Sequence, residues 1–201
     1  MKRVYRGCLV VFLLFLSLSA AYAQGQTQPI VQPAQETAKK LKVGFDLDDT
    51  LIFSTPAFNK GFKSVHERFS RGFWTLVNKS DRDNSTVKEG AKRILDEHKE
   101  HGDEIFIVTA RGPYGTQPLL DYIAETFNVK KENVFFEPRG KADRIKLLGL
   151  DIYYGDADSD ISDAIKAGAK GIRIERSEMS WNTKKYHPGK YNERVIENSA
   201  E

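Results

Sequence analysis

Short apolar runs alternate with amphipathic segments along most of this chain. Five runs after residue 40 are rich in Val, Ile, Phe and Tyr and too short for helices, which indicates β-strands; they cover residues 41–45, 105–108, 134–136, 152–154 and 171–174. Between them, apolar positions recur at helical spacing near residues 86–100, 117–127, 140–148 and 159–167. This alternation predicts an α/β fold, a doubly wound parallel sheet with helices on both faces.

Capping residues define the ends of two predicted helices. Ser85 or Thr86 is expected to begin the first of them, which should end at Gly102. The last predicted helix is expected to begin at Ser159 or Asp160. Gly168 should end it.

The connection after the first strand is longer than the others. Residues 54–79 lie between this strand and the next predicted helix, and a loop of that length without helices is uncommon. Ligands of parallel sheets bind at the carboxyl ends of the strands. We therefore predict a small helical cap over that edge of the sheet, inserted at about residues 54–85.

The first residues have the composition of an export signal. A basic start, an apolar stretch at residues 8–18 and the small residues of Ala21-Tyr22-Ala23 predict a signal peptide over residues 1–23. The alternative is a retained membrane anchor, for which the apolar stretch is short. We expect export to the periplasm, with secretion as the second choice.

Removal of the signal changes the charge of the chain. The full sequence has 31 Lys and Arg, 28 Asp and Glu and a formal net charge of +3, and three of the basic residues lie in the predicted signal. The mature protein would be neutral, so the charge of +3 is no evidence for nucleic acid polymers or anionic membranes as partners, and we expect neither after signal cleavage. The single cysteine, Cys8, also lies in the signal. Residues 24–40 are expected to be a flexible arm or, alternatively, an arm that orders against a partner. Residues 41–201 are expected to be one domain.

Acidic residues follow two of the predicted strands. The segment GFDLDDTLI contains Asp46, Asp48 and Asp49, and the segment GDADSD contains Asp156 and Asp160. Because the carboxyl ends of parallel strands meet at one edge, these side chains are expected to converge. A hard divalent cation would offset their repulsion, and we predict Mg²⁺ with Asp46 and Asp156 as ligands. Alternatively, single acidic residues such as Asp49 or Asp160 only stabilise a turn or a helix end.

Four pieces of sequence occur in an informative order. They are DLDDT, TAR at residues 109–111, Lys141 and GDADSD, and together they resemble the haloacid dehalogenase (HAD) superfamily of phosphotransferases. The segments FDLDDTLIFSTPAF, IVTAR, YYGDADSDISDAIKAGAKGIRIERS and ERVIENS narrow the resemblance. Over residues 40–199 the chain is similar to the bacterial class B non-specific acid phosphatases. This resemblance implies a HAD-like Rossmannoid fold, Mg²⁺, a periplasmic location and a homotetramer.

The resemblance also implies catalytic roles for two aspartates. Asp46 matches the nucleophile and Asp48 matches the general acid/base. Metal ligation would keep Asp46 ionised, whereas Asp48, bound only through its backbone, is expected to keep a raised pKa. An acidic pH optimum would follow.

The remaining roles concern substrate and metal. Thr109 and the backbone of Ala110 match the phosphate-binding turn, where many family members have Gly in place of Ala110. Lys141 matches the lysine that neutralises phosphate charge, although a solvated surface lysine is the alternative. The implied metal ligands are the carboxylates of Asp46 and Asp156, the backbone carbonyl of Asp48, and Asp160 through water.

Aromatic residues are candidates for the wall of a substrate pocket. Phe58 and Trp74, with Trp181 as a third, are expected to contact the leaving group; alternatively they are ordinary core residues. Arg111 either faces the phosphate or pairs with a nearby acid.

The expected function is a Mg²⁺-dependent acid phosphatase. It would hydrolyse small phosphomonoesters, such as nucleotides and aryl and sugar phosphates, through an aspartyl-phosphate, and transfer phosphate to alcohols. The alternative is a non-catalytic phosphate-binding or surface interaction protein on the same scaffold. The sequence lacks the RHG tripeptide, GxSxG and a GxxxxGK loop, so histidine phosphatases, serine hydrolases and P-loop enzymes are poor fits.

Overall fold

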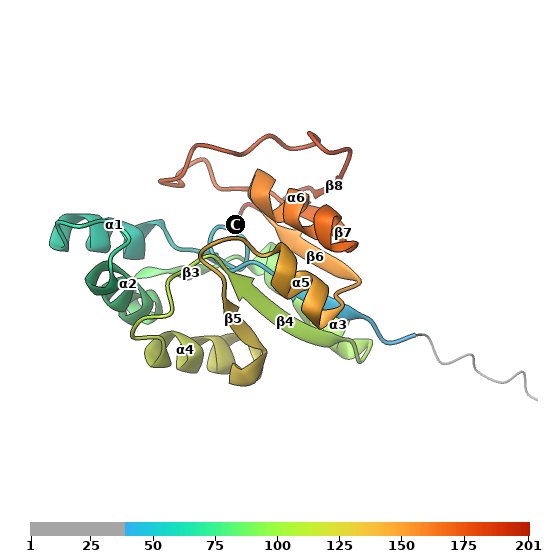
Figure 1. Ribbon diagram of the computed structural model, residues 1–201, viewed down its shortest axis with the longest axis horizontal. Helices are drawn as coiled ribbons and strands as arrows, with labels where there is room; N and C mark the ends of the chain where they lie inside the picture. The colour runs from blue at the N-terminus through green and yellow to red at the C-terminus, as the bar shows by residue number, and fades with distance from the viewer. Residues whose placement is uncertain (1–38) are drawn as a thin grey trace, which may run out of the picture. The chain divides into compact units, whose positions relative to one another are not determined.

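Six parallel strands form the central sheet of the computed structural model, which describes residues 39–201 (Figure 1). Their order across the sheet is β5-β4-β1-β6-β7-β8, and every neighbouring pair is parallel. The strands are β1 (Lys42–Phe45), β4 (Glu104–Thr109), β5 (Val134–Phe136), β6 (Ile152–Gly155), β7 (Lys170–Ile174) and β8 (Arg194–Ile196). The first five were predicted, whereas the edge strand β8 was not.

Four helices cover the two faces of this sheet, which confirms the predicted doubly wound fold. They are α3 (Glu89–Glu100), α4 (Gln117–Phe127), α5 (Ala142–Leu148) and α6 (Asp158–Ala167). Alternate residues of β4 show the two faces: Ile105 and Ile107 pack in the core with α3 and α4, and Phe106 and Val108 in the core with α5 and α6. The last two helices, drawn in orange, lie in front of the sheet in Figure 1. Burial on both faces explains why the strands are continuously apolar.

A helical cap follows β1, as predicted. Two short antiparallel strands, β2 (Ile52–Phe53) and β3 (Thr86–Val87), flank the helices α1 (Thr55–Ser64) and α2 (Arg71–Asn84). The two helices pack through their own small core, whose buried members are Ala57, Phe58, Phe73, Trp74 and Val77. The cap therefore has its own core and is joined to the sheet by a two-stranded connection.

The predicted start of the first helix was wrong. Thr86 and Val87 pair with Phe53 and Ile52 in the short hairpin, and α3 begins only at Glu89. Both residues are β-branched, a property that favours extended backbone once a partner strand is available. A contact with a distant strand therefore overrides the capping signal of the local sequence.

The ends of α6 differ in how well they were predicted. Gly168 ends the helix with a left-handed φ of 83°, as expected. The helix begins earlier than expected, at Asp158, with Ala157 in the capping position. Asp160 accepts a hydrogen bond from the Ala157 backbone N–H at 3.0 Å, so it does stabilise this helix end.

Two predicted segments fall outside the described residues. The predicted signal peptide, residues 1–23, does so entirely, and the predicted arm, residues 24–40, does so except for its last two residues. Within residues 39–201, no helix has the length and apolar character needed to cross a bilayer.

Candidate active site

A cavity of about 460 Å³ lies between the carboxyl edge of the sheet and the cap. It is lined by residues from the ends of β1, β4 and β6, from the cap and from the segment after β7. The structure thus brings together nearly all of the residues predicted from the sequence, namely Asp46, Asp48, Phe58, Trp74, Ala110, Lys141, Asp156, Asp160 and Trp181. The exception is Thr109.

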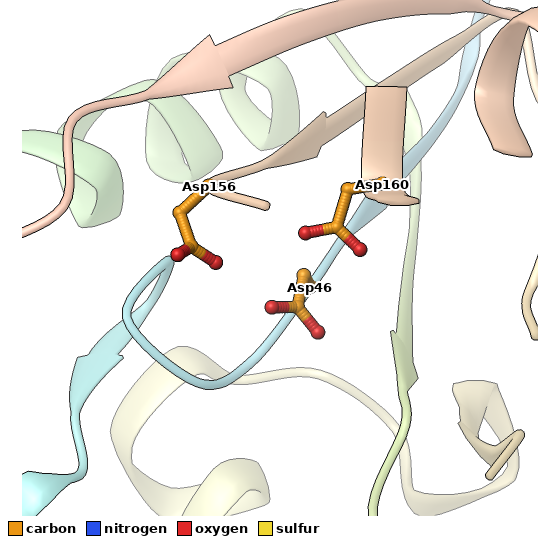
Figure 2. A group of neighbouring side chains, drawn as sticks. All are labelled: Asp46, Asp156 and Asp160. Atoms are coloured by element: carbon orange, nitrogen blue, oxygen red, sulfur yellow. The ribbon is translucent and has the colours of Figure 1, made fainter. Parts of the chain in front are cut away.

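Three buried aspartates face one another at the base of this cavity. Figure 2 shows Asp46 after β1, Asp156 after β6 and Asp160 in the first turn of α6 as neighbouring side chains. One oxygen of each lies within 4.8 Å of the others. The Thr50 hydroxyl is 3.3 Å from oxygens of both Asp46 and Asp156. The predicted convergence of two strand ends is therefore present.

The aspartate cluster has the chemistry of a metal site. Burial raises the pKa of Asp46 well above its ordinary value, and the carboxylates of Asp160 and Asp156 add to this effect. Burial likewise raises the pKa of Asp156, to about 7. Desolvation, with mutual repulsion added, disfavours the ionised form of these carboxylates although Lys141 and Arg176 oppose this, and a hard cation with oxygen ligands would stabilise that form further. The residues present therefore fit a divalent metal ion.

Lys141 is part of the same cluster. It is 5 % exposed, so the alternative of a solvated surface lysine is wrong. Its ammonium donates to Asp46 Oδ1 at 2.5 Å and to Asp160 Oδ1 at 2.7 Å. Burial alone would lower the pKa of Lys141, but the two carboxylates raise it well above its ordinary value. The side chain is therefore a permanent cation.

Asp48 is held by Arg111. The guanidinium donates from Nε to both carboxylate oxygens, at 3.1 and 2.9 Å, and from Nη2 to Oδ1 at 2.6 Å. Although burial acts to raise the pKa of Asp48, Arg111 lowers it below its ordinary value. The expectation of a raised pKa at Asp48 was therefore wrong: pairing with an acid was one of the two roles expected for Arg111, but the sequence does not specify that this acid is Asp48.

The cap supplies the other partners of Arg111. From α2, Asp81 accepts from Nη1 at 2.5 Å and from Nη2 at 3.0 Å, and Asn78 accepts from Nη1 at 3.2 Å. Arg111, Asp81 and Asn78 are all fully or nearly fully buried. Of the two roles considered for Arg111, the structure favours pairing with acids. The cap is thereby connected to the candidate proton carrier through one side chain.

The turn after β4 is only partly as expected. Ala110 lines the cavity, and within the described residues it is not one of the positions with positive φ, so its side chain is compatible with the turn. Thr109 is fully buried, and its Oγ1 lies 3.3 Å from the Arg111 backbone N–H, which donates to it. Thr109 therefore lies behind the wall of the cavity and supports the turn.

Aromatic side chains form one wall of the cavity. Phe58 lies between two indoles: Trp181 stacks on it with centroids 5.1 Å apart, and Trp74 meets it edge-on at 5.8 Å. The Trp181 backbone N–H donates to Thr55 Oγ1 at 3.0 Å, which anchors the segment after β7 on α1. Phe58 and Trp74 belong to the cap core as well as to the wall, so the two interpretations of these residues are compatible.

Sequence reasoning missed Arg176, which contacts the cluster from the segment after β7. Its Nε donates to Asp156 Oδ2, and its Nη1 donates to the carbonyls of Asn182 at 2.5 Å and Lys184 at 2.9 Å. The sequence does contain a pattern that points to Arg176, since this residue follows the apolar run GIRI just as Asp46 and Asp156 follow their strands. The expectation that polar residues collect at strand ends covered the ends of β1, β4 and β6 but was not extended to the end of β7.

Asp158 is the acidic residue of GDADSD that does not face the cluster. Arg173, His187 and Lys190 surround its carboxylate at 3.3, 2.7 and 3.0 Å. Burial opposes ionisation, but hydrogen bonds from His187 and Lys190 hold the pKa of Asp158 well below its ordinary value. Its role is to anchor the segment that precedes β8.

Gly155 provides a steric test of the cluster. A Cβ at this position would lie 2.3 Å from Asp160 Cβ, so Gly155→Ala must displace Asp160 or the start of α6. We expect kcat/KM for a phosphomonoester to fall by about tenfold or more, because small displacements of reacting groups are costly. Gly72→Ala is the control, since its nearest neighbours would be 3.9 Å away. Equal activity of both variants would contradict the importance of the Asp160 position.

Comparisons with solved structures agree with this fold. CbbY from Rhodobacter sphaeroides in complex with phosphate aligns with a TM-score of 0.56 at 13% identity, covering 81% of this chain and 96% of that one. A HAD hydrolase of family IA from Entamoeba histolytica aligns with a TM-score of 0.55 at 20% identity, covering 78% and 92%. The architecture is that of the HAD-superfamily hydrolases.

Comparisons of sequence identify the family within this class. Residues 18–177 match the family described as HAD superfamily, subfamily IIIB (acid phosphatase). A class B acid phosphatase from a Marinomonas species is 36% identical over 168 residues, covering 78% of this chain and 71% of the relative. One from Salmonella arizonae is 34% identical over 172 residues, covering 79% and 73%. The chain belongs to this family and is an acid phosphatase that acts on small phosphoesters.

Proposed function

We propose that this phosphatase uses Mg²⁺ and forms a covalent phosphoryl intermediate on Asp46. The observation that carries the proposal is the position of the Asp46 carboxylate. It is buried, lies against the Lys141 ammonium and faces the carboxylates of Asp156 and Asp160. A protein that only binds phosphate does not need a carboxylate at this point, since it would repel the ligand.

In the first step, an oxygen of Asp46 attacks phosphorus and the ester oxygen departs. Lys141 stabilises the negative charge on the phosphoryl oxygens, because its ammonium lies beside the attacking group in a buried site. Mg²⁺, held by the carboxylates of Asp46 and Asp156, by the Asp48 backbone carbonyl and, through water, by Asp160, would supply further positive charge at the phosphoryl group. Attack through Asp46 divides one difficult hydrolysis into two easier reactions.

Asp48 carries the protons of both steps. Bound by Arg111 and ionised, it is suited to be the base that removes a proton from the water that releases phosphate from Asp46. To protonate the leaving group in the first step, its carboxylate must first exchange Arg111 for a proton. Arg111 therefore sets the balance between the two forms of Asp48.

The aromatic wall indicates the substrates. Phe58, Trp74 and Trp181 offer apolar and stacking surface near the cluster, which suits nucleotides and aryl phosphates. A cavity of about 460 Å³ also has room for small sugar phosphates. An alcohol that replaces water in the second step would give phosphate transfer.

Location and assembly are part of the proposal. The basic start, apolar stretch and Ala21-Tyr22-Ala23 support export to the periplasm. The family resemblance supports a homotetramer. Light scattering of the mature protein measures its assembly state, and a mass of one subunit would contradict the tetramer.

Removal of metal tests the proposed chemistry directly. We expect purified protein with Mg²⁺ to hydrolyse p-nitrophenyl phosphate at about pH 6. EDTA should lower this activity by about 100-fold or more, because the aspartates then repel both one another and the substrate. Excess Mg²⁺ should restore the rate. Activity that is indifferent to the chelator would contradict the metal's role and leave Lys141 as the principal cation.

A further inference from the structure

Lys88 is a buried lysine that the proposed reaction does not use. It lies between β3 and α3, and only 1 % of its surface is exposed. Its ammonium donates to the backbone carbonyl of Asp49 at 2.6 Å and to that of Glu175 at 2.5 Å. Both acceptors are neutral peptide groups. The lysine therefore joins two segments that are distant in the sequence.

The first of these segments is the turn that follows the nucleophile. Asp49 lies three residues after Asp46 and has a left-handed φ of 55°, an unusual conformation for a residue with a side chain. The Lys88 backbone N–H also donates to the Leu51 carbonyl at 2.9 Å. Backbone and side chain of Lys88 thus hold the same turn at two points.

The second segment contains Arg176, the partner of Asp156, which is the other proposed carboxylate ligand of the metal. Glu175 directly precedes Arg176, whose Nε donates to Asp156. Five residues beyond Glu175, the Ser180 hydroxyl donates to Asp49 Oδ2 at 2.5 Å, so the two segments also meet directly. A shift of Glu175 would move Arg176 and with it the orientation of Asp156.

A buried ammonium at this position is unfavourable for stability. Burial lowers the pKa of Lys88 to about 8, although the carboxylates of Asp156, Asp49 and Glu175 oppose this and Arg176 adds to it. Below that pH the folded protein retains a charge that would be better solvated in the unfolded chain. A neutral side chain of similar length would avoid this cost. Retention of an unfavourable group beside a reaction centre is typical of a functional role.

We propose that Lys88 is a positioning residue, which joins the turn after β1 to the segment after β7 and so fixes Asp46 and Asp156 at the separation that one cation requires. The inference rests on the proposed metal-dependent function and adds a residue outside the cavity to it. Lys88 acts through Asp49 and Arg176 and touches neither substrate nor metal.

Calorimetric titration of the full protein with Mg²⁺ tests the positioning role of Lys88. We expect Lys88→Met to bind Mg²⁺ about tenfold or more weakly and to lose kcat/KM for p-nitrophenyl phosphate by a similar factor. Loss of a nearby positive charge would by itself tighten binding of a cation, so weaker binding reports displaced carboxylates. Lys92→Met is the control, because Lys92 lies on α3, one turn after Lys88, and pairs with Asp96 on the same helix.

The free energy of unfolding, measured at several pH values, establishes whether the Lys88→Met variant is folded. The folded pKa of Lys88 is below its unfolded value of 10.5, so its contribution to stability rises as pH increases from about 8 to 10.5. The free energy of unfolding of the wild type should therefore rise over this range relative to that of Lys88→Met. If Lys88→Met does not fold, Lys88→Gln, which keeps a donor for one carbonyl, is expected to show the same weaker Mg²⁺ binding to a smaller degree.

Two outcomes would overturn the inference in distinguishable ways. Folded Lys88→Met, or Lys88→Gln in its place, that binds Mg²⁺ as tightly as the wild type or more tightly would leave the proposed function intact and remove the positioning role. Wild-type protein that binds no Mg²⁺ would overturn the proposed function and this inference with it.

Discussion

Asp46→Asn should lower kcat for p-nitrophenyl phosphate by about 10⁴-fold or more while leaving the protein folded. The amide keeps the shape of the carboxylate but is a poor nucleophile. Lys141 keeps its second partner, Asp160, at 2.7 Å. The binding site should thus survive, so inorganic phosphate is expected to bind to the variant at least as well as to the wild type.

The same substitution should change the pH dependence of stability. Burial raises the folded pKa of Asp46 above its unfolded value of 3.8, so the stability linked to this group is present at low pH and is lost as pH rises through the folded pKa. In EDTA, the wild type should therefore lose more stability than Asp46→Asn as the pH rises above the unfolded pKa of 3.8. Urea unfolding at several pH values measures this difference.

Asp83→Asn is the matched control, because Asp83 is an exposed acid at the end of α2. It should leave both kcat and the pH dependence unchanged. If Asp46→Asn retained most of the activity, the covalent mechanism would be wrong. If the wild type with Mg²⁺ bound phosphate but did not hydrolyse p-nitrophenyl phosphate, the proposed mechanism would be wrong.

Asp48→Asn should slow alkyl phosphates by about 10³-fold and aryl phosphates much less. An alkoxide needs a proton to leave, whereas p-nitrophenolate leaves readily without one. The amide oxygen of Asn can still accept from Arg111, and the Arg111–Asp81 pair remains, so the cap should keep its attachment. Measured kcat values for a series of leaving groups should show a steeper dependence on leaving-group pKa in the variant.

Equal losses for alkyl and aryl substrates would remove Asp48 from the first step. A loss confined to the second step would appear as accumulation of the phosphorylated protein, which mass spectrometry of the quenched reaction detects. That result would assign Asp48 as base only, in keeping with its ionised state beside Arg111.

Much of the fold could be predicted because its determinants are local. The five predicted strands have continuous apolar runs, since both faces of a parallel sheet are buried, and the four sheet-covering helices have helical periodicity. Because ligands of parallel sheets bind at the carboxyl ends of the strands, the sequence alone was enough to predict that Asp46 and Asp156 lie close together. The family resemblance implied a site role for Lys141, and in the structure its ammonium contacts Asp46.

Features that depend on distant contacts were missed or wrongly expected. The strands β2 and β3 have two residues each and exist only because they pair, so no local pattern indicates them. Thr109 matches a family motif but is covered by the turn that it supports. The motif specifies a residue type, whereas its exposure depends on how neighbouring segments pack.

The sequence by itself determined the α/β architecture, the helical cap and the convergence of acidic strand ends, because periodicity and strand order are properties of the chain. Only the tertiary structure decided the charge states. Asp48 is paired with Arg111 across 63 residues and Lys88 with the Asp49 carbonyl across 39. Burial and partner distance fix a pKa, and both arise only when segments far apart in the sequence fold against one another.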